Sequence, residues 1–217
     1  NIVPFGALSR DSNGVLALRQ SAGNFEVRQN VSFANGAQVA VNGMLPPWVV
    51  TPASGDFLAY DGLVKTLVYK TTAPNTWTET DVVHNSSTRT LEADAAVYAL
   101  RASADLTVPS GLTLTNAGGG LILVGKTLHG NGMLTSGTNE LVVYATSSSA
   151  INTAIAANGL IVWGGGTLSV SNLTWSGGTW IHQGILKASL GEDAVFSNRR
   201  IDGIGEFSKD GPGDLTL

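Results

Sequence analysis

Residues 141–181 read LVVYATSSSAINTAIAANGLIVWGGGTLSVSNLTWSGGTWI, and this stretch decides the fold. Aliphatic residues occur in short runs with a period of two, as in Leu141–Val143 and Leu168–Val170, and Gly, Asn and Ser separate the runs. A period of two over a few residues indicates a short β-strand, and the small polar residues between runs indicate turns. The stretch therefore predicts an all-β structure with many short strands.

The same pattern recurs every twenty residues in the C-terminal half. An aliphatic residue ends each repeat, and a small residue precedes it by four positions: Leu121, Leu141, Ile161, Ile181 and Ile201 follow Ala117, Gly137, Ala157, Gly177 and Ser197. So short a repeat buries its apolar face only by stacking on its neighbours. About twenty residues fit three strands of about 4–5 residues with corners between them. We therefore predict a parallel β-helix with about 20 residues per turn and with Gly and Asn at its corners.

The N-terminal part of the chain is less regular. Val15–Leu18, Phe25–Phe33 and Val39–Val41 resemble strands of the same coil. Residues 45–81 break the pattern with four of the seven prolines, and Asp61-Gly62 between two apolar runs predicts a hairpin with a type I′ turn. We expect one β-helix domain over residues 1–217, with an irregular insertion and hairpin at about 45–81, and regular stacking after about residue 88.

Helix signals are nearly absent. The two short candidates, Leu91–Ala99 and Ile151–Ala157, also fit strands joined by turns. No run approaches ~18 consecutive apolar residues, so we expect no transmembrane helix in this chain.

Charge and composition limit the possible partners and chemistry. Charged residues make up 13% of the chain, about half the usual share, and the net charge is −4 without a basic block. A nucleic-acid partner is therefore not expected. The chain has no cysteine, which excludes disulfides and thiolate metal sites. It begins Asn-Ile-Val without a signal-peptide pattern, so we expect a processed chain or a piece of a longer one.

Two motifs connect the chain to a known family. The pattern G-x-G-x-L-x-[LV] appears as GGGTLSV (164–170) and again in KDGPGDLTL (209–217), and Y/W-x-G-G-T-x-I-x-x-G-x-L appears in WSGGTWIHQGILKAS (175–189). These motifs resemble the autotransporter-associated β-strand repeat of bacterial autotransporter passenger domains. Residues 133–162 are similar to the segment that commonly precedes this repeat in long surface proteins. The resemblance covers about residues 90–217, and more loosely Trp48–Tyr60, and departs at Val162, where the family commonly has lysine.

The resemblance implies a right-handed β-helix outside a bacterium, in a non-catalytic role of adhesion, surface display or scaffolding. Its implied partners are further repeats or copies of itself stacked end to end, and glycans or proteins on a host or neighbouring cell. Two alternatives stay open. One is a self-assembling extracellular filament subunit, and the other is a carbohydrate-binding or carbohydrate-cleaving β-helix.

Candidate catalytic groups are sparse. Glycoside hydrolysis needs two carboxylates about 5–10 Å apart, and the close pairs are Glu92/Asp94 and Glu192/Asp193, which we interpret as solvated charges. No G-x-S-x-G motif is present. The glycine runs 118–120 and 164–166 lack the P-loop Lys-Ser/Thr and are interpreted as corners. His84, His129 and His182 are too scattered for a metal motif. We expect no catalytic residue, no metal and no cofactor.

Two sets of residues are candidates for contacts. The aromatic side chains of the irregular segment are candidates for a binding surface, because exposed rings stack on sugars or anchor protein contacts: Trp48, Tyr60, Tyr69 and Trp77. They also fit a role in covering the side or open end of the coil. At the C-terminus, Leu215 and Leu217 are expected to face inward with nothing above them, which predicts stacking of another turn on the coil end.

Overall fold

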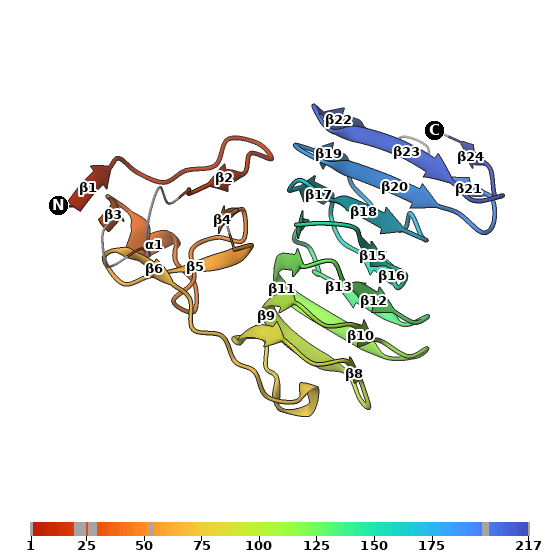
Figure 1. The fold of residues 1–217 in the computed structure, drawn as a ribbon, viewed down its shortest axis with the longest axis horizontal. Coiled ribbons are helices and arrows are strands. Elements are labelled where there is room, and N and C mark those ends of the chain that lie inside the picture. The colour runs from red at the N-terminus through yellow and green to blue at the C-terminus, as the bar shows by residue number, and fades with distance from the viewer. Residues whose placement is uncertain (1, 20–24, 26–29, 53, 197–199, 217) are drawn as a thin grey trace. The chain divides into compact units, whose positions relative to one another are not determined.

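The computed structural model describes residues 2–19, 25, 30–52, 54–196 and 200–216, and its secondary structure is almost entirely β (Figure 1). The chain forms two compact units, Asn1–Tyr69 and Lys70–Leu217. Figure 1 colours the first from red to orange and the second from yellow to blue. The all-β prediction is therefore confirmed.

The first unit holds a two-stranded parallel sheet and a four-stranded mixed sheet. In the first, β1 (Ile2–Phe5) pairs with β3 (Asn30–Phe33). The second has the order β2-β4-β5-β6 and comprises β2 (Leu16–Ala17), β4 (Val49–Thr51), β5 (Asp56–Tyr60) and β6 (Val64–Thr66). A single helical turn, α1 (Gly36–Val39), follows β3. The unit has its own core, which includes Leu8, Phe25, Phe33, Leu45, Val49, Leu58, Tyr60 and Val64.

The predicted hairpin is present, but its turn differs from the prediction. β5 and β6 are antiparallel, with Tyr60 opposite Val64, so three residues connect them instead of two. A type I′ turn needs positive φ at both central residues. Here Gly62 has φ +103° and Asp61 does not have positive φ, so the predicted turn type is wrong.

The N-terminal strands do not belong to the coil. Of the three predicted coil strands, Val15–Leu18 contains β2 and Phe25–Phe33 contains β3, although residues 26–29 lie outside the described residues. The third, Val39–Val41, begins at the last residue of α1. All are separate from the sheets of the second unit. The hairpin therefore precedes the coil instead of interrupting it, and segment 45–81 is divided between the two units. A period of two indicates a strand but not its partner, which explains the error. A single domain over 1–217 stays a prediction.

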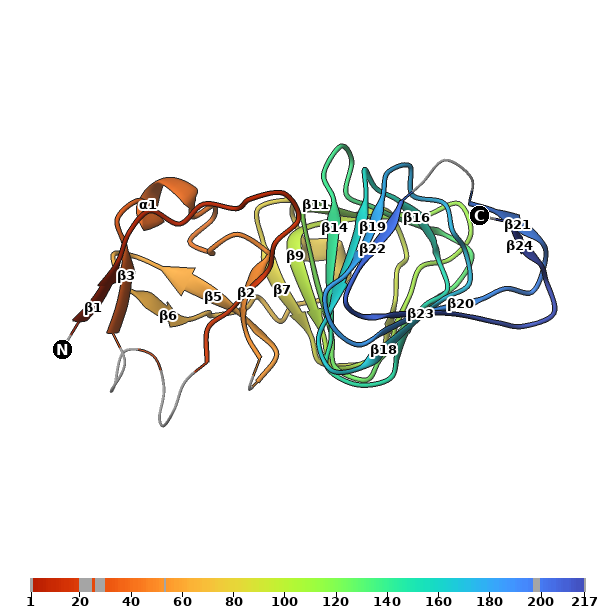
Figure 2. The same cartoon turned by 90° about the horizontal axis from the view of Figure 1, so that it is seen from above.

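The second unit is a β-solenoid of about six turns with about 21 residues per turn (Figure 1). Each strand pair named within it is parallel, and the strands form three columns; Figure 2 looks along the stack. The first column runs through β8 (Arg89–Thr90), β10 (Leu106–Thr107), β12 (Thr127–His129), β15 (Ser149–Ile151), β18 (Thr167–Val170), β20 (Ile185–Ser189) and β23 (Glu206–Asp210).

The other two columns share a sheet, because β9 (Ala95–Ala102) and β11 (Thr113–Leu123) each run through both. The second column continues with β13 (Met133–Thr135) and β16 (Ala154–Ala156). The third contains β7 (Val82–Asn85), β14 (Leu141–Ala145), β17 (Leu160–Trp163), β19 (Thr179–Ile181) and β22 (Ile201–Gly203). A separate pair, β21 (Ala194–Val195) and β24 (Leu215–Thr216), belongs to the last turns. The predicted stacked parallel coil is thus confirmed.

The aliphatic residues that recur every twenty positions in the sequence do not form one row of stacked side chains in the structure. Leu121 lies opposite Val143, Val143 opposite Val162, and Val162 opposite Ile181, so the first step along the chain is longer than the next two. Leu141 instead lies opposite Leu160. Ile161 falls between the inward residues Leu160 and Val162 and is absent from the coil core. The turns therefore differ in length about a common mean, and a fixed period mixes inward and outward positions.

The core of the coil is a continuous aliphatic cluster along its length. It contains Leu100, Leu121, Val143, Val162 and Ile181 from the third column, together with Leu and Ile residues of the other two columns. Near the last turns Trp175 packs edge to face against Phe196, with ring centroids 5.3 Å apart. Each turn thus buries its apolar face against the turns above and below, as a solenoid requires.

The two glycine runs lie at two different corners of the coil. Gly164–Gly166 connects β17 to β18 and forms a corner, as predicted. Gly118–Gly120 instead lies within β11, where the ladder shifts register between Asn116 and Gly120. The Asn116 Nδ2 donates to the Gly120 carbonyl oxygen at 2.8 Å across this bulge. The run lies where β11 passes from the second column, at Thr113–Thr115, to the third, at Gly120–Leu123, and Gly119 has φ +74°. It therefore marks a corner as predicted, although the strand continues through it.

Helical structure is short in the part of the chain that the structure describes. Besides α1, it comprises the 3-10 turn η1 (Pro74–Thr76), and none of these helices is long or apolar enough to cross a membrane.

Candidate functional site

The first turn of the coil is covered by the loop 70–81. Lys70 forms a parallel bridge to Val83, with its N–H donating to the Val82 carbonyl oxygen and its carbonyl oxygen accepting from the His84 N–H, both at 2.9 Å. Arg89, in β8, donates from Nη2 to the Thr71 carbonyl oxygen at 3.5 Å. The loop therefore occupies edge groups of β7 that would otherwise be open to pairing.

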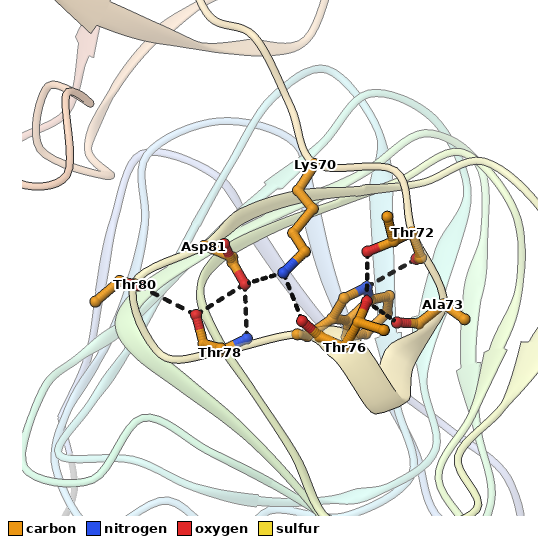
Figure 3. Close-up of polar contacts among 8 residues, drawn as sticks. Lys70, Thr72, Ala73, Thr76, Thr78, Thr80 and Asp81 are labelled. Carbon is orange, nitrogen blue, oxygen red and sulfur yellow. Dashed lines mark hydrogen bonds and ion pairs between the residues drawn. The ribbon is translucent and has the colours of Figure 1, made fainter.

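Asp81 organises this loop (Figure 3). Its Oδ2 accepts hydrogen bonds from the Lys70 Nζ at 2.7 Å, the Thr78 N–H at 2.7 Å and the Thr78 Oγ1 at 2.8 Å. Burial alone raises the pKa of Asp81, but the hydrogen bonds from Lys70 and Thr78 outweigh it and hold the pKa below its usual value. The carboxylate is thus a structural anion, held by three donors.

Trp77 closes the apolar end of the coil beneath this loop. Its side chain is 7% exposed and packs in the coil core together with Val83 and Leu91. Its Nε1 donates to the Thr72 carbonyl oxygen at 2.9 Å. We call residues 70–81 the cap, because they close the first turn with a polar network outside and an indole ring inside.

The last described turn is different. In residues 200–216, β22, β23 and β24 each pair with a strand of the preceding turn, and the structure describes no strand on their other side. Leu215 is half-buried and packs against the coil core, whereas Leu217 lies outside the described residues. Stacking of another turn on these residues stays a prediction. Lys187 and Asp210 form an ion pair at 2.6 Å on β20 and β23, and the hydrogen bond from Lys187 lowers the pKa of the exposed Asp210.

The four predicted aromatic residues do not form one surface. Tyr60 is 7% exposed in the core of the first unit, where its hydroxyl donates to the Phe33 carbonyl oxygen and accepts from the Phe33 N–H. Trp77 is buried in the cap of the second unit. Half-buried Tyr69 accepts from the Phe57 N–H at 2.9 Å and donates to the Asp56 Oδ1 at 3.1 Å.

Trp48 is half-buried against the core of the first unit, with the Arg10 guanidinium carbon 5.9 Å from its ring centroid. Burial therefore removes Tyr60 and Trp77 from any exposed stacking surface. A binding role for Trp48 and Tyr69 stays a prediction.

In each of the two close carboxylate pairs, the aspartate connects neighbouring turns. The Asp94 Oδ1 accepts from the Thr113 N–H at 2.8 Å, and the Asp193 Oδ1 accepts from the Asp214 N–H at 2.8 Å. Asp105 does the same with the Thr127 N–H at 2.9 Å. In each close pair, one carboxylate therefore satisfies a main-chain donor of the next turn, and Glu92 and Glu192 are exposed.

The histidines lie apart in the coil. His84 Nε2 contacts the Ser103 Oγ and the Arg101 Nη1, both at 2.7 Å. Since the guanidinium only donates, it makes Nε2 an acceptor. His129 lies 3.7 Å from the Asp105 carboxylate. Over the described residues no group of three His, Cys, Asp or Glu side chains is arranged to hold a metal ion.

A polar groove lies at the corner between the first and second columns. It has a volume of about 720 Å³. Its floor carries residues that end the first-column strand in successive turns, and its outer wall is the loop that leads into β21. The lining comprises Asn131, Asn152, Ser171, Asn172, Leu173, Thr174, Ser189, Leu190, Gly191, Glu192, Asp193, Ala194 and Val195. We call it the corner groove.

The floor and wall of the corner groove are held by main-chain contacts. The Asn172 Nδ2 and the Ser171 Oγ both donate to the Asn152 carbonyl oxygen, at 3.2 and 3.1 Å. The wall is fixed by the Asp193–Asp214 bond and by pairing of β21 with β24, which Figure 2 shows at the outer edge of the stacked turns. The groove is therefore pre-formed.

Sequence reasoning missed the corner groove, although a signal was present. Asn131, Asn152 and Asn172 recur once per turn, each just after a strand of the first column. Repeated asparagines at one corner of a solenoid form a polar row on its surface.

The fold places this chain among the parallel β-solenoid repeat proteins. Comparisons with protein-family models, with curated proteins and with solved structures find no match to this chain. The class is therefore defined by the stacked coil alone.

Proposed function

We propose that this chain is a structural or adhesive β-helical segment of a protein exported to a bacterial cell surface, similar to an autotransporter passenger domain. The observation that carries the proposal is the continuous aliphatic core of the coil, which extends through about six stacked turns. Stability that accumulates turn by turn suits a rod that presents surface far from its anchor.

The composition supports an extracellular location. Small hydrogen-bonding residues cover the surface in place of Lys and Glu, and charged residues are 13% of the chain. The motifs at 164–170 and 175–189 provide the link to the autotransporter repeat.

A non-catalytic role is supported by how the carboxylates are used. Asp94 and Asp193 each accept a main-chain N–H of the next turn, so neither close pair offers two unengaged carboxylates. A retaining or inverting glycosidase needs both groups available to the glycosidic bond.

The filament alternative is weakened by the cap. End-to-end stacking of identical copies is a heterologous contact, which requires the two ends of each copy to be complementary. The cap covers the edge of β7 in the first turn and buries Trp77 in the coil core. We therefore favour single rods. The partner that fits the edge formed by β22 and β23 is another turn of coil, and not the capped end of a second copy.

Two measurements test this proposal. Antibodies against the purified chain are expected to label intact cells of its source organism, and labelling only after permeabilisation would contradict surface export. Electron microscopy of the purified chain is expected to give short rods of uniform length. Long fibres that grow with concentration would favour the filament subunit.

A further inference from the structure

The corner groove offers hydrogen-bonding groups that the protein itself does not use. The side-chain amides of Asn131 and Asn152 have no hydrogen-bond partner among the described residues, and both residues are exposed. Glu192 is also exposed and unpaired over the same part of the chain. Each primary amide has two donor hydrogens and an acceptor oxygen, and a carboxylate adds further acceptors. These groups come from successive turns and from the wall, so they surround one space.

The chemistry of the lining selects a class of ligand. Amides, hydroxyls and carboxylates together satisfy molecules rich in adjacent hydroxyl groups. Within the described lining there is no lysine or arginine, while Glu192 and Asp193 carry negative charge, so an acidic ligand is disfavoured. Val195, on the wall, is 67% exposed and gives an apolar surface for the C–H groups of a ring.

The size of the groove fits a short chain of sugar rings. Its volume of about 720 Å³ lies within the range of ligand pockets. Because its walls are fixed by the contacts of Asn172 and Asp193, binding does not have to order the site first. We propose that the corner groove binds a neutral oligosaccharide of two or three residues, through Asn131, Asn152 and Glu192. The site goes beyond the structural role proposed above and does not depend on it.

The test begins with the intact purified chain on a glycan array of neutral and acidic oligosaccharides. Neutral binders are then titrated, with lactose, cellobiose, maltotriose and N,N′-diacetylchitobiose as a minimum set, while ¹H–¹⁵N spectra are recorded. We expect saturable binding in roughly the millimolar range, with shifts concentrated at Asn152, Asn172 and Gly191–Val195. Sialyllactose and trigalacturonic acid serve as acidic comparisons and are expected to bind more weakly.

Matched variants locate the site. Asn152→Ala and Glu192→Ala are each expected to weaken binding roughly three- to tenfold, since each removes a hydrogen bond to the sugar. Asn158→Ala, an exposed asparagine outside the groove, is expected to leave it unchanged. Circular dichroism melts check that all three variants fold like the parent. The proposal is overturned if no neutral oligosaccharide binds, if acidic ones bind better, if Asn158→Ala weakens binding as much, or if the shifts map elsewhere. These outcomes leave the cell-surface test untouched, so the two proposals fail separately.

Discussion

Leu121 lies directly opposite Val143 on the next turn of the coil, and both side chains are fully buried in its core. Leu141, which lies twenty residues after Leu121 in the sequence, instead pairs with Leu160. Two core side chains are therefore neighbours when their positions pair between adjacent turns, and not when they lie twenty residues apart in the sequence. The coupling free energy between two core substitutions should follow this pairing.

Leu121→Ala is expected to lower the free energy of unfolding by about 2–5 kcal/mol, because it leaves a cavity in a closed ladder. The outward Ser169→Ala serves as control and should stay within about 0.5 kcal/mol. In a double-mutant cycle by urea denaturation, Leu121→Ala and Val143→Ala should couple by at least about 0.5 kcal/mol. Leu121→Ala and Leu186→Ala, which lie several turns apart, should be additive, and equal coupling in both cycles would contradict this register.

The corner at Gly164–Gly166 allows a test with adjacent positions. Gly164 has φ +107°, and a Cβ there would lie 2.3 Å from the Ala145 carbonyl oxygen, whereas a Cβ at Gly165 would meet no atom within 4 Å. Gly164→Ala should destabilise the coil by more than about 1 kcal/mol. Gly165→Ala should be neutral or stabilising by up to about 1 kcal/mol. Thermal denaturation distinguishes them, and similar melting temperatures would argue against this corner geometry.

Asp81 predicts a pH dependence of coil stability. Because its pKa is lowered in the folded state, the contribution is present above the unfolded value near 3.8 and is lost as pH falls through the lower folded value. Asp81→Asn should therefore lower stability at pH 7 by about 1 kcal/mol, and the difference from the parent should shrink below about pH 4. Asp210→Asn, at an exposed ion pair, is the control and should have little effect. A difference that persists unchanged at low pH would exclude this origin.

Trp77 predicts what an uncapped coil does. Trp77→Ala removes the ring that closes the first turn and should cost about 3–5 kcal/mol. It should also increase association measured by light scattering, since strand edges lose their cover. Trp77→Phe keeps an aromatic ring but loses the hydrogen bond to Thr72, and should show a smaller loss of stability and no association. Association by both variants to the same extent would mean that the ring does not protect this end.

Much of the second unit was predictable because its information is local and repeated. The period-two runs at Leu141–Val143 and Leu168–Val170 indicate strands without reference to a partner. Gly164 marks a corner because only glycine tolerates its backbone conformation. The ladders themselves were not predictable, because turns of unequal length share one mean period. The pairing of Leu121 with Val143 instead of Leu141 depends on where each turn takes up its extra residues.

The candidate sites were less predictable, for a physical reason. An aromatic-rich segment gives the same composition whether its rings are exposed, as proposed for Trp48, or buried with internal hydrogen bonds, as for Tyr60 and Trp77. The corner groove forms from residues that lie on different turns, so their proximity depends on stacking.

The sequence by itself determined the stacked all-β coil, because each repeat of alternating aliphatic residues can bury its apolar face only against another repeat. Only the tertiary structure decided that residues 1–69 form their own sheets and core and that residues 70–81 cap the coil. It also decided that three asparagines and two carboxylates surround one groove. Partner choice between strands is a long-range property, set by turn length and core packing, and an alternating pattern does not encode it locally.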